Sequence, residues 1–282
     1  MGAAFESAVE AVIAGDLVTL RDLLAANPGL VFARSPRHGA TLLHYLSANG
    51  VEDHRQRSPG NAVEIARLLL EAGAEVDALA DFYGGQCPTL TLLVSSTPPA
   101  KAGVQIPLTE LLLDFGAAIE GTGEGPWKSP LMTALAFGFL DTARVLVRRG
   151  AQVRTLAAAA GLGDLHRAAA LLTGADAEDR HRATALAAQL GHLEVLRLLL
   201  DNGEDPNRFN PPSCHAHSTP LHQAVAAGHL DVVRLLVARG ARLDVEDTIH
   251  HGTPLAWAEH CGRSEIAGYL RGLKANCLPP QS

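Results

Sequence analysis

The chain has 282 residues, 47% of them hydrophobic, with a formal net charge of −7 and an isoelectric point near 6.0. Because the charge is negative and the basic residues form no continuous stripe, a nucleic acid is excluded as the expected partner. Aromatic residues make up only 4%, and alanine and leucine dominate, which favours thin helical layers over a bulky globular core.

Targeting signals and cysteine usage indicate a cytoplasmic protein. The longest apolar run, residues 155–163, is far too short to cross a bilayer, and the N-terminus lacks the pattern of a signal peptide. Only three of the 23 basic residues are lysine, a bias typical of GC-rich genomes, so we expect a bacterial source. Reduced thiols are expected of the four widely spaced cysteines, Cys87, Cys214, Cys261 and Cys277.

In chain order, the sequence predicts a series of helix pairs, each with a turn between its two helices. The first pair covers 3–14 and 17–25 and turns at Gly15. The second begins at the motif Ala40-Thr41-Leu42-Leu43-His44 and turns at Gly50. A polar loop over 51–60 then precedes its second helix, which we expect at 62–72.

The third pair is the most degenerate. It begins at Pro88-Thr89-Leu90, and its turn near Thr97 lacks a glycine. A loop over 95–103 contains two adjacent prolines, and the second helix is expected at 107–115.

Pairs four to six turn at Gly138, Gly163 and Gly191. The connections into the last two are short, because only 13 residues separate Gly150 from Gly163 and 17 separate Gly174 from Gly191, against 22 to 25 elsewhere. We therefore expect these two connections to be stunted.

The stretch 218–241 reads as one complete pair. Thr219 is placed to cap a helix, with Pro220 at the first helical position. Gly228 suits a left-handed turn, and Gly240 ends the second helix. An eighth pair runs from Thr253 through a turn at Gly262.

The order Thr-Pro-Leu-His, Ala-Ala, Gly-His, Leu-Leu and Gly-Ala within this stretch resembles the ankyrin repeat. The resemblance implies an all-α solenoid in which each helix pair buries its apolar face against its neighbours. Tetratricopeptide repeats fit less well because their spacing of Trp, Gly and Tyr is absent, and runs of β-branched residues typical of a mixed α/β domain are missing. We expect one domain over 1–275, a flexible tail over 276–282, and eight repeats turning near residues 15, 50, 97, 138, 163, 191, 228 and 262.

In this family, the segment between repeats forms a hairpin finger, and the fingers and first helices line a concave face. A lengthened finger over 204–218 beside two stunted ones predicts a notch in that face. Exposed aromatic and basic residues at finger tips are typical of interface anchors, although the aromatic ones could instead fill gaps between hairpins. The expected partner-binding residues are Arg37, His38, Asp81, Phe82, Tyr83, Trp127, Lys128, Arg180, His181, Phe209, His215, His217, Asp247, His250 and His251.

A cluster of Cys and His residues near the C-terminus is a candidate metal site. Cys214, His215 and His217 lie one repeat before His250 and His251, and neighbouring repeats stack about 10 Å apart, so these groups could converge on zinc. Histidine-rich loops are more often solvated, so we expect no metal and no cofactor. By contrast, the motif histidines, His44 and His222, are expected to bond backbone between repeats, as in the family.

The resemblance implies a protein–protein interaction module that binds a protein partner through its concave face and finger tips, and we expect a monomer. The alternative is a small-molecule or catalytic site in the notch that uses the same Cys and His residues. A binding module predicts a broad open groove, whereas an enzyme predicts a deep pocket with convergent titratable groups. The sequence has no phosphate-binding loop or nucleophile elbow, so no catalytic residue is assigned.

Overall fold

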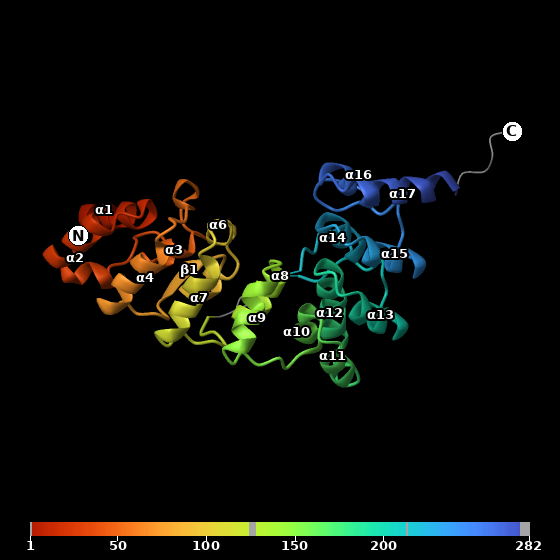
Figure 1. Ribbon diagram of the computed structural model, residues 1–282, viewed down its shortest axis with the longest axis horizontal. Helices are drawn as coiled ribbons and strands as arrows, with labels where there is room; N and C mark the ends of the chain where they lie inside the picture. The colour runs from red at the N-terminus through yellow and green to blue at the C-terminus, as the bar shows by residue number, and fades with distance from the viewer. Residues whose placement is uncertain (1, 124–127, 213, 277–282) are drawn as a thin grey trace. The chain divides into compact units, whose positions relative to one another are not determined.

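Pairs of helices joined by short turns make up the computed structural model of the chain (Figure 1). It describes residues 2–123, 128–212 and 214–276, with side chains up to residue 273. The all-α repeat fold predicted from the sequence is confirmed. None of the helices in the described part of the chain is long and apolar enough to cross a membrane.

The chain divides into two compact units, Met1–Gln152 and Val153–Ser282, here called the N-terminal and C-terminal units. The single domain over 1–275 stays a prediction. Helix α17 ends at Asn276, and the rest of the predicted tail lies outside the described residues.

In the N-terminal unit, each repeat pairs a first helix with a second. The first helices are α1 (Gly2–Ala14), α3 (Leu42–Ser47), α5 (Thr89–Leu93) and α8 (Pro130–Ala136). The second helices are α2 (Leu17–Ala26), α4 (Ala62–Glu71), α7 (Gln105–Asp114) and α9 (Leu140–Arg148). The first helices pack in sequence, α1 on α3, α3 on α5 and α5 on α8. All six residues of α3 are buried, which places the core between successive repeats.

Short elements fill the connections of this unit. They are the 3-10 helices η1 (Pro28–Phe32) and η2 (Asp53–Arg55), helix α6 (Thr97–Lys101), and the antiparallel strands β1 (Leu79–Phe82) and β2 (Gly85–Pro88). The two strands form one finger. In place of the turn expected near residue 97, the third repeat has a longer connection that contains α6. Gly103, with φ of +73°, supplies the left-handed residue there.

The C-terminal unit repeats the same arrangement. Its first helices are α10 (Leu156–Leu162), α12 (Ala177–Gln189), α14 (Pro220–Ala227) and α16 (Pro254–His260). Its second helices are α11 (Leu165–Leu172), α13 (Leu193–Asp201), α15 (Leu230–Ala238) and α17 (Ser264–Asn276). Each first helix packs on the next, and the second helices pack in the same order.

Helix α12 replaces the stunted finger that precedes it. With 13 residues it begins at Ala177, only a few residues after α11 ends, and leaves no room for a hairpin. Asp179, in its first turn, accepts hydrogen bonds from the N–H groups of Leu156 and Ala157 at 2.8 and 3.0 Å. A carboxylate from the next repeat thus caps α10, where negative charge is favourable.

The motif histidines tie repeats together, as predicted. The Nδ1 atom of His44 bonds the hydroxyl and N–H of Thr41, and its Nε2 lies 3.2 Å from the carbonyl oxygen of Cys87. His222 repeats this pattern and reaches the carbonyl oxygen of Gly252 at 3.0 Å. Burial lowers the pKa of His44 to about 4, so its ring is neutral near pH 7.

The polar loop inserted after α3 folds back onto the first helix. Arg55 forms ion pairs with Glu6 and Glu10 at 2.6 and 2.9 Å, and its guanidinium lies 5.9 Å from the ring centroid of Tyr45. Only 12% of the Arg55 side chain is exposed. The insertion therefore covers the terminal repeat, which has no earlier neighbour within the described residues.

Candidate partner-binding surface

The finger formed by β1 and β2 carries three of the predicted site residues, and they face different ways. Side chains alternate along a strand; accordingly Asp81 is exposed while Phe82 is 3% exposed. Tyr83, in the turn, is 64% exposed. The expectation that all three meet a partner is therefore wrong for the Phe82 ring, which fills space inside the unit.

The contacts of Phe82 explain its burial. Its ring lies 4.9 Å from the ring of His38 and 6.1 Å from that of His44, measured between centroids. It also covers the turn at Gly50, where an added Cβ would lie 2.6 Å from the Phe82 ring. The Phe82 ring thus packs between its own finger, the neighbouring finger that carries His38, and helix α3.

Tyr83 is held on the surface by its hydroxyl. The hydroxyl donates a hydrogen bond of 2.5 Å to Oδ1 of Asn49, which lies two residues after the end of α3. Partial burial raises the pKa of Tyr83 above its ordinary value, which keeps this donor protonated. The ring is therefore exposed yet fixed in place.

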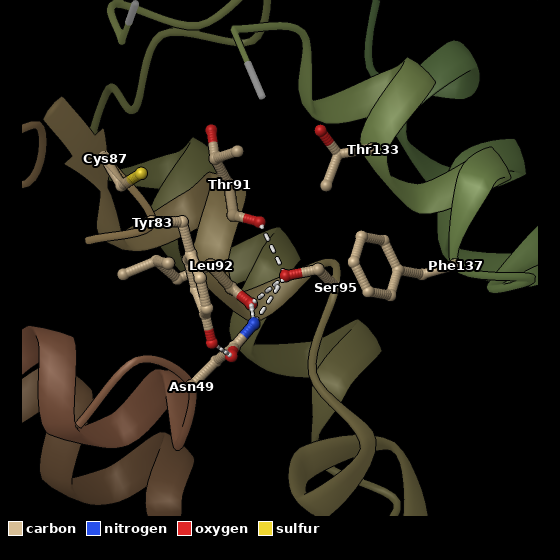
Figure 2. Close-up of a pocket in the computed structure, with 8 residues that line it drawn as sticks. All are labelled: Asn49, Tyr83, Cys87, Thr91, Leu92, Ser95, Thr133 and Phe137. Carbon is tan, nitrogen blue, oxygen red and sulfur yellow. Dashed lines mark hydrogen bonds between the residues drawn. The ribbon is translucent and has the colours of Figure 1, made fainter. Parts of the chain in front are cut away.

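A pocket of about 150 Å³ opens beside Tyr83. Figure 2 shows the rings of Tyr83 and Phe137 on its two sides, with Ser95 between them. The remaining lining residues are Asn49, Cys87, Thr91, Leu92 and Thr133. All of them lie in the N-terminal unit, on the finger and on or beside α3, α5 and α8.

Asn49 and Ser95 bond each other at the base of this pocket (Figure 2), whereas the buried hydroxyls of Thr91 and Thr133 in its lining have no hydrogen-bond partner in the described part of the chain. Asn49 donates through Nδ2 to Oγ of Ser95 at 2.7 Å, and Ser95 donates to the carbonyl oxygen of Leu92 at 2.8 Å. Burial raises the pKa of the Cys87 thiol, so it carries no charge near pH 7. The pocket is consequently uncharged and mainly apolar.

The other predicted residues of the N-terminal unit have separate environments. Arg37 and Lys128 are exposed. His38 is half-buried, and its Nδ1 lies 3.0 Å from the carbonyl oxygen of Asp81, which links two fingers. Trp127 lies outside the described residues.

In the C-terminal unit, two predicted residues on α12 face inward. Arg180 forms an ion pair with Glu204 at 2.7 Å, and both side chains are largely covered. His181 is 6% exposed, and burial lowers its pKa. Phe209 is half-buried. The expected exposure of His181 is wrong because α12 replaces the finger that was to carry it.

Asp247 is also buried, at 1% exposure, and organises the last finger. Its carboxylate accepts from the N–H groups of Ile249, His250 and Gly252 and from Nε1 of Trp257, all at 2.7 to 2.9 Å. Burial alone would raise the pKa of Asp247, but these hydrogen bonds hold it well below its ordinary value. Asp247 is therefore a structural residue that shapes the turn rather than an exposed contact.

A second pocket, of about 500 Å³, lies beside this finger. His217 lines it and lies 5.9 Å from the ring of Trp257, centroid to centroid. His250 is exposed at its edge, and His260 and Cys261 complete its titratable lining. Two of the residues that the sequence analysis assigns to the notch, His217 and His250, line this pocket, but the two short connections that predict the notch do not, so the notch stays a prediction.

The candidate metal ligands of the sequence analysis have different environments. Cys214 is buried at 1% exposure, whereas His215 and His251 are exposed, each with a positive φ. Among the residues that the structure describes, no three His, Cys, Asp or Glu side chains are placed to hold a metal ion.

Sequence reasoning missed Phe137, Asn49 and Ser95. A signal for Phe137 exists, since it directly precedes the turn glycine of its repeat, where no other repeat has an aromatic residue. The roles of Asn49 and Ser95 depend on contacts between repeats, which no local pattern encodes.

Comparisons with known proteins identify the family. Models of the ankyrin repeat match residues 38–81, 156–247 and 210–278. The human protein named cyclin-dependent kinase 4 inhibitor B is 38% identical over 120 residues, which are 41% of this chain and 84% of that protein. The chain belongs to the ankyrin repeat family.

Other relatives of this ankyrin repeat protein are much longer. Ankyrin repeat and SAM domain-containing protein 6 of Mus musculus is 36% identical over 95 residues, 34% of this chain and 10% of that protein. Ankyrin repeat and KH domain-containing protein mask-1 of Caenorhabditis elegans is 25% identical over 226 residues, 76% of this chain and 8% of that protein. The chain thus spans about a tenth of the length of these relatives. They are eukaryotic, and the bacterial source stays a prediction.

Proposed function

We propose that this ankyrin repeat protein is a protein–protein interaction module that binds a partner through exposed finger-tip and first-helix residues. The observation that carries the proposal is the fixed, exposed ring of Tyr83 beside that of Phe137, which is 43% exposed. Exposed aromatic rings held in place before binding lose little entropy on association. They are also the residue type that most often anchors interfaces.

Two further observations support a binding role. The pocket beside Tyr83 has no charged lining residue and is therefore poorly suited to acid–base chemistry. The relatives include two human proteins named as inhibitors of cyclin-dependent kinases, names that describe action on other proteins. A kinase as the partner of this chain does not follow from those names.

The proposal is tested by affinity capture with the full chain from a lysate of its source organism, followed by mass spectrometry. We expect Tyr83→Ala to deplete at least one captured protein. The control is Phe32→Ala, because Phe32 is similarly exposed, at 63%, and does not line the pocket. Identical captured sets for all three chains would refute binding through this finger.

We further propose that the protein is a cytoplasmic monomer. Light scattering coupled to size-exclusion chromatography tests the oligomeric state, and a dimer mass would contradict it.

A second candidate function is a small-molecule or catalytic site in the pocket of the C-terminal unit. The observation that favours it is the presence of His217, His250, His260 and Cys261 in one lining. If Cys261 were a catalytic thiolate, it would react with iodoacetamide at pH values well below the ordinary pKa of a thiol. A pH profile for Cys261 like that of a free cysteine would leave the binding role as the better proposal.

A further inference from the structure

The pocket between Tyr83 and Phe137 has a size and lining that select its occupant. Its volume of about 150 Å³ matches a cavity known to hold one benzene molecule. None of its lining residues is ionic, and the Cys87 thiol is neutral. A charged group entering it would lose hydration without gaining a counter-charge.

Tyr83, whose ring lines one side of the pocket, has a strained backbone conformation. Tyr83 and Gly84 form the two-residue turn between β1 and β2, both with positive φ, at +52° and +74°. Such turns favour Asn, Asp or Gly at the first position, since a bulky side chain is strained there. The bond from the Tyr83 hydroxyl to Asn49 holds the ring against the first-helix face despite this strain.

Phe137, whose ring lines the opposite side of the pocket, lies at the end of α8, directly before the turn at Gly138. No equivalent position in the other repeats holds an aromatic residue, so the repeat fold itself does not require a ring there. These positions are Ala14, Asn49, Leu162, Leu190, Ala227 and Cys261. The two rings face one pocket although they belong to different repeats (Figure 2).

We propose that this pocket receives one uncharged, apolar side chain of the partner protein, of about the size of a phenylalanine ring. The inference rests on the proposed function and names the chemistry of the group that would be recognised. The two rings stack on the incoming side chain, while the hydrogen-bonded base of Asn49 and Ser95 stays unchanged.

The test uses single capped residues as probes of side-chain chemistry. N-acetyl-phenylalanine amide, N-acetyl-aspartate amide and N-acetyl-lysine amide are titrated into the full chain, and the resonances of the lining residues are followed by NMR. We expect saturable shifts with the phenylalanine probe at millimolar concentration and at least tenfold weaker binding of both charged probes. Equal or tighter binding of a charged probe, or no shift with the phenylalanine probe, would overturn the proposal.

Two variants locate the binding. Phe137→Ala is expected to weaken binding of the phenylalanine probe about three- to tenfold, the range of one aromatic pair, and Phe32→Ala is expected to leave it unchanged. Circular dichroism verifies that both variants remain folded. Equal affinity of Phe137→Ala and the unchanged chain would overturn the proposal.

The outcomes also separate this inference from the proposed function. Capture of a partner that depends on Tyr83, without binding of the phenylalanine probe, would refute the anchor pocket and leave the interaction module standing. Probe binding without any captured protein would refute the interaction module and, with it, the anchor role.

Discussion

Replacing Gly50 with alanine is expected to destabilise the N-terminal unit by about 2–4 kcal/mol. Gly50 has φ of +78°, a conformation that costs an L-residue about 1 kcal/mol. The new Cβ would also lie 2.6 and 2.8 Å from two carbons of the Phe82 ring. Phe82 is 3% exposed and has no solvent to move into, so relieving the clash costs about 1–3 kcal/mol more.

Gly103→Ala is the matched control. Its φ of +73° is nearly the same, but no atom lies within 4 Å of an added Cβ. We therefore expect a loss of only about 1 kcal/mol, from backbone strain alone. The difference between the two variants isolates the contact with Phe82.

The assay is urea denaturation followed by circular dichroism, with hydrogen exchange over residues 42–93 to assign the loss to the N-terminal unit. Equal destabilisation by the two variants would refute the reasoning. It would mean that the Phe82 ring does not pack against the turn at Gly50. Phe82 would then again be a candidate for an exposed partner-binding residue.

Three further predictions concern His44, Arg55 and the cysteines. The pKa of His44 is about 4 when folded and about 6.5 when unfolded, so the unfolded chain binds more protons in that window. Stability should fall by about 3 kcal/mol as pH drops from 6.5 to 4; an equally steep slope in His44→Gln would contradict this assignment. Arg55→Ala should cost about 1 kcal/mol, because its partners Glu6 and Glu10 are half exposed and screened, and a cost that does not shrink in high salt would argue against the ion pairs. Under native conditions, maleimide labelling mapped by mass spectrometry should modify the exposed Cys261 and spare the buried Cys87; rapid labelling of Cys87 would show that its finger opens.

Much of the fold was predictable because it is local. Thr219, Pro220 and Gly228 encode the start and end of α14 within ten residues, and the structure places these positions accordingly. His44 and His222 were also assigned correctly, since each caps its own helix before it reaches the next repeat. The short spacing from Gly174 to Gly191 predicted a stunted finger, and in the structure α12 takes the place of that finger altogether.

The candidate site was predictable only in part. The sequence placed Tyr83 at a finger tip but could not separate it from Phe82, since the twofold alternation of a four-residue strand depends on its register with β2. The sequence predicts that Asp247 is an exposed contact. Its burial could not be predicted, because it depends on how the turn folds around the carboxylate and on a hydrogen bond from Trp257, ten residues away. The Cys and His residues near the C-terminus are close in sequence, but finger geometry directs Cys214 inward and His215 outward.

The amino-acid sequence by itself determined the repeat family, the positions of most turns and the structural histidines, because helix caps and glycine turns are set by neighbouring residues. Only the tertiary structure decided which finger residues remain exposed and that Tyr83 and Phe137 face one pocket. Those features depend on how successive repeats stack, and stacking brings together side chains more than fifty residues apart.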